Sequence, residues 1–203
     1  MKTMIKLLRY IFSIILLIVF IMQPAAGQRF NISRGLPFIR NYAPEEYQAH
    51  EKNFDIMQDA EGLMYFANFA GVLQFDGAGW NKIVSSSGMR ILSLDINKQG
   101  TIFAGGLYDF GFLKKDTYGQ TNFISLISKK DNIEDIGLVF KVICVDDKVW
   151  FISENNIYIY DGKKLEIKKL DSKLLSAFQV GADLFFFLTL KSKIRNWEAS
   201  TNM

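Results

Sequence analysis

Short apolar runs alternate with turn-forming residues along most of the chain. The runs are rich in β-branched and aromatic side chains, and Gly, Asp or Asn separates them, which is the pattern of strands joined by hairpins. One segment predicts strands over residues 54–58, 63–67, 71–75 and 80–84. A later segment predicts strands over residues 141–145, 149–153, 157–160 and 164–168. Some of these runs, such as residues 149–152, are apolar at every position, so both faces of the predicted sheets should be buried.

This pattern of strands and turns repeats along the chain. Gly62 in the first copy aligns with Gly100 in the second, and Gly71 aligns with Gly111, which implies two inserted residues between these landmarks. The third copy, over residues 140–162, follows the first at one constant offset. Self-similarity of this kind is typical of repeat folds, in which each copy is one unit of supersecondary structure.

A fourth copy begins near Ala177, and successive copies lie roughly 40 residues apart, a length that fits the four strands of one β-propeller blade. We therefore predict an all-β fold, a partial β-propeller of about three and a half four-stranded antiparallel blades over residues 53–187, after an N-terminal signal helix. A β-sandwich is the alternative. It would not place glycines, aromatic residues and Asp-Gly pairs in register from copy to copy.

The first 27 residues carry a different pattern. Three basic residues precede an apolar run over residues 10–22, and small residues follow at Ala25 and Gly27. This order predicts a secretory signal peptide over residues 1–27, ahead of a lead-in over residues 28–52. The run is shorter than the ~20 residues of a membrane-spanning helix, so cleavage is favoured over a retained anchor. We expect an exported protein, in the periplasm or at the outer face of the cytoplasmic membrane.

The charge balance changes once this segment is set apart. The whole chain has 24 basic and 21 acidic residues, a net charge of +3. Three of the basic residues and none of the acidic ones lie in residues 1–27, so the remainder is formally neutral. A nucleic-acid-binding surface needs a basic patch or stripe. We therefore expect no nucleic-acid partner for this part of the chain.

The repeat resembles that of the two-component regulator propeller family. The first copy carries the family pattern at Asp59, Gly62, Tyr65, Gly71, Leu73, Phe75, Asp76 and Gly77. The residues ahead of it are similar to those of sensors in that family, at Gly35, Pro37, Ile39, Asn41, Tyr42 and Tyr47. The third copy departs from the pattern at Asn156, where the family has glycine.

The resemblance implies a sensor that acts in signal transduction. It implies an extracytoplasmic propeller followed by a triple-tyrosine immunoglobulin-like domain and a membrane span. Beyond the span it implies a cytoplasmic output, either a histidine kinase or a helix-turn-helix regulator.

Residues 188–203 do not continue the repeat. We expect an atypical tail there, which a truncation or a frameshift would explain. The chain is then expected to be the N-terminal fragment of a longer sensor. The expected partners are then the missing C-terminal blades and the output domain. Open sheet faces and edges leave an alternative function, a self-associating interaction module whose edges pair between copies.

No residues suited to catalysis or metal binding stand out. Asp109-Phe110-Gly111 matches the magnesium-binding triplet of protein kinases, but the other kinase motifs are absent from the sequence. His50 is the only histidine and Cys144 the only cysteine, so a usual zinc site is not expected. We predict a non-catalytic protein with no cofactor and no metal. The alternative is a fragment of a periplasmic carbohydrate-active enzyme, which would need carboxylates that converge from several blades.

One group of loops is a candidate ligand-binding face. In a propeller, the loops between the second and third strands of each blade gather on one face. The candidate residues on these loops are Asn68, Phe69, Tyr108, Asp109, Glu154 and Asn155. Aromatic and amide side chains of this kind stack on and hydrogen-bond to small polar ligands. We expect an extracytoplasmic ligand such as a glycan or a peptide.

Overall fold

The computed structural model describes residues 39–88, 90–127, 136–181, 183–189 and 196–198. The chain divides into two compact units, residues 1–40 and 41–203, and all the described strands belong to the second unit. The predicted signal peptide, and the lead-in as far as residue 38, lie outside the described residues. Within the described part, no helix has the length and apolar character needed to cross a membrane.

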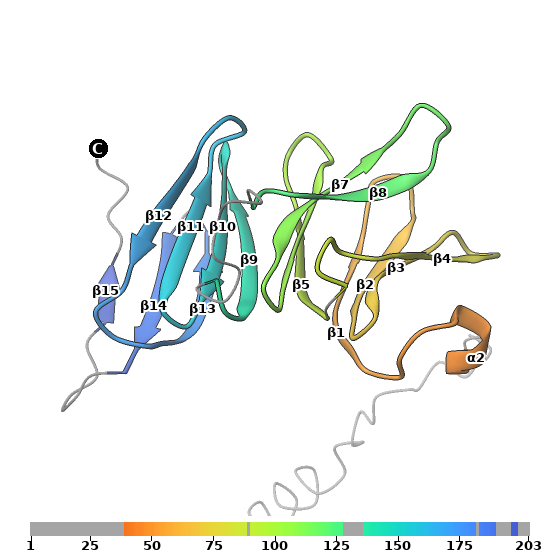
Figure 1. The fold of residues 1–203 in the computed structure, drawn as a ribbon, viewed down its shortest axis with the longest axis horizontal. Helices are drawn as coiled ribbons and strands as arrows, with labels where there is room; N and C mark the ends of the chain where they lie inside the picture. Colours follow the sequence, from red (N-terminus) through yellow and green to blue (C-terminus); the bar gives the residue numbers. More distant parts are fainter. Residues whose placement is uncertain (1–38, 89, 128–135, 182, 190–195, 199–203) are drawn as a thin grey trace, which may run out of the picture. The chain divides into compact units, whose positions relative to one another are not determined.

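The strands form four antiparallel sheets, each a meander of consecutive strands (Figure 1). Blade 1 contains β1 (Asn53–Gln58), β2 (Met64–Asn68), β3 (Gly71–Phe75) and β4 (Trp80–Ile83). Blade 2 contains β5 (Ile91–Ile96), β6 (Ile102–Gly106), β7 (Phe110–Lys115) and β8 (Thr121–Ser125). Blade 3 contains β9 (Val139–Val145), β10 (Lys148–Ser153), β11 (Asn156–Tyr160) and β12 (Leu165–Lys169). Blade 4 contains β13 (Leu174–Val180), β14 (Asp183–Leu188) and β15 (Asn196–Glu198).

The sequence prediction of a partial propeller with four-stranded antiparallel blades is confirmed. The eight predicted strands of the first and third copies all form, with ends that differ from the prediction by at most two residues. Blade 4 differs from the expectation. Its third strand, β15, pairs with β14 and lies within the range assigned to the atypical tail. This strand spans three residues and lacks the glycine and aspartate of the repeat, so the pattern did not reveal it.

The alignment of Gly71 with Gly111 was wrong. Phe66 pairs with Leu73 in blade 1, and the equivalent Ala104 pairs with Gly111 in blade 2, so Gly111 corresponds to Leu73. The turns between the second and third strands are equally short in both blades. The extra residues of blade 2 lie instead in the hairpin between β7 and β8, which is longer than the hairpin between β3 and β4.

Apolar side chains fill the spaces between successive blades. Blades 1 and 2 share one cluster of buried residues, blades 2 and 3 a second, and blades 3 and 4 a third. The second cluster is the most aromatic, with Phe151 packed on Phe110 at 4.5 Å between ring centroids. Both faces of blades 2 and 3 are therefore buried, as their continuous apolar runs predicted.

The first strands of neighbouring blades are also joined by hydrogen bonds. Asp55 on β1 accepts one from the Ser93 hydroxyl (3.1 Å) and one from the Leu94 backbone N–H (3.0 Å) of β5. Asp95 on β5 accepts one from the Cys144 backbone N–H of β9 (2.6 Å). In each case a carboxylate of the earlier blade satisfies a backbone donor of the later one, and hydrogen bonds to a charged acceptor are the stronger kind.

The short helix α2 (Pro44–Tyr47) packs beside β4 at the outer part of blade 1 (Figure 1). Tyr42 and Tyr47 from this segment each contact the ring of Trp80, both at 5.3 Å between centroids. Phe75 lies on the same ring at 4.5 Å. Aromatic contacts therefore cover the outer strands of blade 1, on the face that points away from blade 2.

The strands β7 and β8 approach each other closely at Gly111, and substitution of this residue tests that packing. A Cβ atom at this position would overlap the carbonyl oxygen of Ile124, which is fixed in the adjacent strand. Gly111→Ala should therefore lower the free energy of unfolding by about 2 kcal/mol in urea denaturation, because the two strands must separate. Gly79→Ala is the matched control, since the nearest atom to its Cβ would lie 3.9 Å away. Equal losses from both substitutions would contradict this reading of the packing.

Candidate functional site

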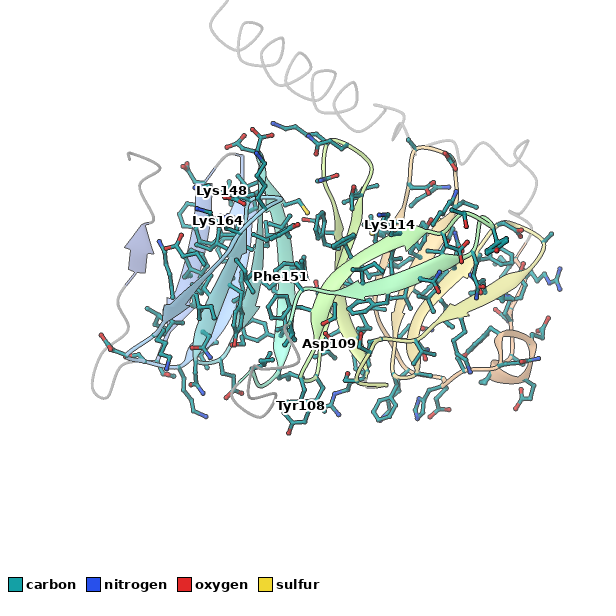
Figure 2. All side chains as sticks on the ribbon, turned by 45° about the horizontal axis from the view of Figure 1, so that its top comes forward. Tyr108, Asp109, Lys114, Lys148, Phe151 and Lys164 are labelled. Carbon is teal, nitrogen blue, oxygen red and sulfur yellow. The ribbon has the colours of Figure 1, made fainter. Side chains whose placement is uncertain are left out.

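The loops between the second and third strands are two-residue turns in blades 1 to 3. They consist of Phe69-Ala70, Leu107-Tyr108 and Glu154-Asn155. Figure 2 shows Tyr108 projecting from one end of the sheets, while Lys148 and Lys164, from the other hairpins of blade 3, lie at the opposite end. The turns of blades 2 and 3 lie close together, because residues of both line one cavity.

A cavity of about 380 Å³ opens between the turns of blades 2 and 3. It brings together three of the predicted site residues, Tyr108, Glu154 and Asn155. The remaining wall comes from Leu107, Ile136, Gly137, Leu138, Ser153 and Asn156. The segment ahead of β9, which supplies part of this wall, was not predicted from the sequence. Within this segment, the one residue whose type indicates a turn is Gly137, which adopts a left-handed backbone conformation with φ of 67°.

The Tyr108 side of the cavity is held by backbone contacts. Tyr108 has a positive φ of 61°, which is uncommon for a non-glycine residue. Its N–H donates to the carbonyl of Gly137 (2.8 Å), and Leu107 forms an isolated β-bridge with Leu138. These contacts fix the turn of blade 2 to the segment that leads into blade 3. The backbone that carries the Tyr108 ring is therefore held in place by hydrogen bonds.

The opposite side of the cavity is held by the connection between blades 3 and 4. The carbonyl of Asn155 accepts a hydrogen bond from the N–H of Leu170 (2.9 Å), and that of Glu154 accepts one from Leu174 (2.7 Å). The Glu154 carboxylate also forms an ion pair with Lys173 at 3.1 Å. Because both side chains of this pair are exposed, water screens it and a ligand can compete for the carboxylate.

Two of the six predicted site residues are buried and belong to the framework, which corrects the expectation that their side chains face the surface. Asn68 is the residue before the turn of blade 1. Its amide donates to the carbonyls of His50 (2.6 Å) and Lys52 (3.1 Å) and to the side chain of Asn53 (2.8 Å). It therefore ties the lead-in to the sheet.

Asp109 is the residue that follows the turn of blade 2. Its carboxylate accepts hydrogen bonds from the Ser125 hydroxyl (2.7 Å) and the Ser87 N–H (3.3 Å). Burial raises the pKa of this carboxyl, and these hydrogen bonds partly offset the increase. The sequence placed Asp109 on a longer loop because Gly111 was aligned with Gly71. The correct register puts it at the base of the turn, where it cannot reach the cavity as an exposed ligand group.

Phe69, the remaining candidate, lies on the turn of blade 1 and does not line the cavity. Its ring stacks on His50 at 4.6 Å between centroids and lies 5.8 Å from the guanidinium carbon of Arg90. Its ring is half exposed. Phe69 therefore shares the same end of the blades with the cavity but belongs to a separate contact.

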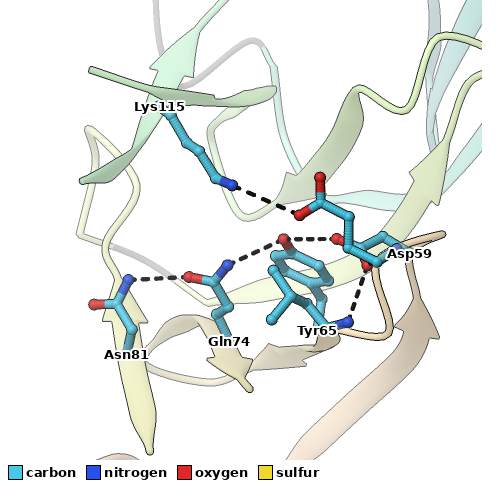
Figure 3. Close-up of polar contacts among 7 residues, drawn as sticks. Asp59, Tyr65, Gln74, Asn81 and Lys115 are labelled. Atoms are coloured by element: carbon cyan, nitrogen blue, oxygen red, sulfur yellow. Dashed lines mark hydrogen bonds and ion pairs between the residues drawn. The ribbon is translucent and has the colours of Figure 1, made fainter. Parts of the chain in front are cut away.

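The other end of blade 1 carries a chain of polar contacts (Figure 3). Asn81 donates to Gln74 (3.2 Å), Gln74 donates to the Tyr65 hydroxyl (3.1 Å), and that hydroxyl donates to Asp59 (3.2 Å). Burial raises the pKa of Tyr65 to about 12, although the hydrogen bond from Gln74 lowers it, so the phenol stays protonated at neutral pH. The Asp59 carboxylate also caps its own hairpin, through the N–H of Leu63. The chain serves to fix the hairpin.

No group of His, Cys, Asp or Glu side chains suited to a metal ion occurs among the described residues. The polar and aromatic groups that line the cavity are the ring of Tyr108, the carboxylate of Glu154, the amides of Asn155 and Asn156 and the hydroxyl of Ser153. This set can stack on and hydrogen-bond to a polar molecule.

No protein-family model and no curated protein sequence matches the chain. Solved β-propeller structures are similar to it, among them the following three. The chain superposes on the WD40 β-propeller domain of Doa1 with a TM-score of 0.52 at 13% identity, over 74% of this chain and 52% of that one. For virginiamycin B lyase from Staphylococcus aureus, solved as a catalytically inactive variant with quinupristin, the TM-score is 0.53 at 12% identity, over 75% of this chain and 57% of that one.

The third structure is the extracellular domain of a putative one-component system from B. thetaiotaomicron. Its TM-score is 0.51 at 14% identity, over 76% of this chain and 25% of that one. The chain thus spans less than two thirds of each of these structures. At such low identities the likeness establishes the β-propeller fold and nothing finer.

Proposed function

We propose that this chain is the ligand-sensing β-propeller segment of an exported bacterial regulatory protein. The observation that carries the proposal is the cavity between blades 2 and 3, where Tyr108, Glu154 and Asn155 converge from two neighbouring turns. The apolar segment of residues 10–22 behind a basic start supports export. An extracellular domain of a one-component system with the same fold adds support for a regulatory role.

The cavity suits a small polar ligand with one apolar face, such as a sugar ring or a short peptide. Tyr108 supplies the stacking surface, while Asn155 supplies both a donor and an acceptor. Glu154 accepts hydrogen bonds from hydroxyl or amide groups. The proposed role is binding without catalysis, because the chemistry of the cavity offers a single carboxylate and no partner acid.

Binding should depend on the ring of Tyr108. We propose to screen the full chain by titration calorimetry against two panels, neutral oligosaccharides and short uncharged peptides. For a probe that binds, Tyr108→Ala should weaken the affinity about tenfold, because a lost stacking contact costs on the order of 1 kcal/mol. Asn155→Ala should weaken it by a similar factor, because one or two hydrogen bonds are lost.

Tyr118→Ala is the matched control, since this tyrosine of blade 2 is 95% exposed in the hairpin between β7 and β8, away from the cavity. It should leave the affinity unchanged. Affinity that is insensitive to Tyr108→Ala would place the binding site elsewhere. Absence of binding to both panels at millimolar concentration would contradict the proposed ligand class.

A further inference from the structure

Blade 4 exposes an apolar sheet face that is buried in the preceding blade. The first two strands of blades 3 and 4 can be aligned by their pairing. The pair that closes the hairpin is Val145–Lys148 in blade 3 and Val180–Asp183 in blade 4, and the register shift lies at equivalent residues in both blades. The residues of blade 3 that pack against blade 4 therefore have direct counterparts in blade 4. The counterparts of Ile143, Val145 and Ile152 are Phe178, Val180 and Phe187.

The two sets of residues differ sharply in exposure. Ile143, Val145 and Ile152 are 3%, 8% and 0% exposed. Their counterparts Phe178, Val180 and Phe187 are 40%, 57% and 38% exposed. The positions of blade 3 that pack against blade 4 are thus apolar, and so are the equivalent positions of blade 4. In blade 4, nothing in the described part of the chain covers these positions.

These exposed side chains form a preorganised surface. The ring of Phe178 stacks on Phe185 and on Phe187, each at 5.5 Å between centroids, with interplanar angles of 16° and 27°. These three rings lie on β13 and β14, the first two strands of the blade. A contiguous apolar patch of this kind is uncommon on a monomer and is typical of an interaction surface.

Blade 1 exposes the complementary face. The hairpin pair Gln58–Met64 corresponds to Ile96–Ile102, so Ile56 on β1 is the counterpart of Leu94 on β5. Leu94 packs against blade 1 and is 5% exposed, whereas Ile56 is 56% exposed. Among the described residues, the segment around α2 contacts this face at the outer strands, through Phe75 on β3 and Trp80 on β4. The open part of this face is therefore its inner part, on β1.

We infer that blade 4 of one copy of this chain packs against blade 1 of a second copy, head to tail. The two open faces are the same pair that packs together at each junction inside the chain. Their exposed apolar side chains lie on β13 and β14 of blade 4 and on β1 of blade 1. Such a contact uses two different surfaces, so it builds either a closed ring or a filament. The inference does not depend on the ligand proposed above.

Sedimentation velocity of the full chain tests the inference. The chain should sediment as dimers or larger assemblies at ~50 μM, and Phe187→Lys should shift it to a monomer, because a charge cannot be buried unpaired in the contact. Tyr118→Lys places the same charge on an exposed aromatic residue of the hairpin between β7 and β8, away from both open faces, and should leave the assembly intact. Thermal unfolding of both variants checks that each remains folded. A monomer at all concentrations, or assembly that survives Phe187→Lys, would overturn the inference.

Cross-linking tests the head-to-tail arrangement. In a Cys144→Ala background, one preparation carries Ile56→Cys and another Phe187→Cys. At the junction of blades 3 and 4, Ile152 is equivalent to Phe187 and Ala177 is equivalent to Ile56. Ile152 and Ala177 belong to one core cluster. A short bismaleimide should therefore link the two variants when they are mixed, and neither variant alone. Efficient linking of a single variant to itself would indicate a symmetric contact and would overturn the arrangement.

Discussion

Replacing Phe151 by alanine is expected to lower the free energy of unfolding by about 3–5 kcal/mol, the range for a large aromatic side chain removed from a packed core. Phe151 is fully buried at the junction of blades 2 and 3. Its ring contacts Phe110 at 4.5 Å and Phe103 at 6.1 Å between centroids, both from the preceding blade. Strands on both sides fix the backbone, so the cavity left by the substitution cannot collapse fully.

Equilibrium unfolding in urea, followed by circular dichroism, measures this loss. Phe54→Ala is the matched control, because Phe54 lies on β1 with 44% of its surface exposed. It should cost less than about 1 kcal/mol, since little apolar area is removed from the interior. If the two substitutions cost the same, the junction of blades 2 and 3 is not a packed core.

The second large effect is expected at Asn68. Asn68→Ala should lower the free energy of unfolding by about 2–3 kcal/mol, because its removal leaves buried backbone groups without a partner. The amide nitrogen serves the carbonyls of His50 and Lys52, and the amide oxygen accepts the N–H of Ala70 (2.8 Å). The segment that carries α2 should also detach more easily from blade 1.

Asn81→Ala provides the comparison for Asn68→Ala. Asn81 is exposed on β4 and donates one hydrogen bond, to Gln74. Its removal should cost about 0.5 kcal/mol. Urea denaturation gives the stabilities, and limited proteolysis followed by mass spectrometry locates the detached segment. If cleavage ahead of residue 53 is no faster in Asn68→Ala than in the unsubstituted chain, Asn68 does not hold the lead-in.

Most of the fold could be predicted from the sequence because each blade is built from local hairpins. Turn residues such as Asp76 and Asp161 mark these hairpins. The carboxylates of both accept two backbone N–H groups each, at 2.7 and 2.8 Å, which lowers their pKa. The third strand of blade 4 could not be predicted in this way. Its pairing depends on a contact with β14, and its own sequence carries no turn signal.

The candidate site was predicted less completely. The turns themselves follow from strand spacing, and Tyr108, Glu154 and Asn155 do lie together. The sequence could not show that the side chains of Asn68 and Asp109 point inward. That depends on which two residues form each turn, because Asn68 lies just before one turn and Asp109 just after another. It also gave no sign that the segment ahead of β9 closes one wall, since that contact joins residues from different blades.

The carboxylates that join the first strands have one further consequence, which concerns the order of assembly during synthesis. In each pair the acceptor, Asp55 or Asp95, lies in the blade that is made first, and the donor lies in the blade that follows. A newly made strand therefore meets a template that already presents its hydrogen-bond acceptor and its apolar face. Domains and repeats generally form from the N-terminus as the chain emerges. The contacts give this stack of blades a built-in direction of growth, from the first sheet towards the last.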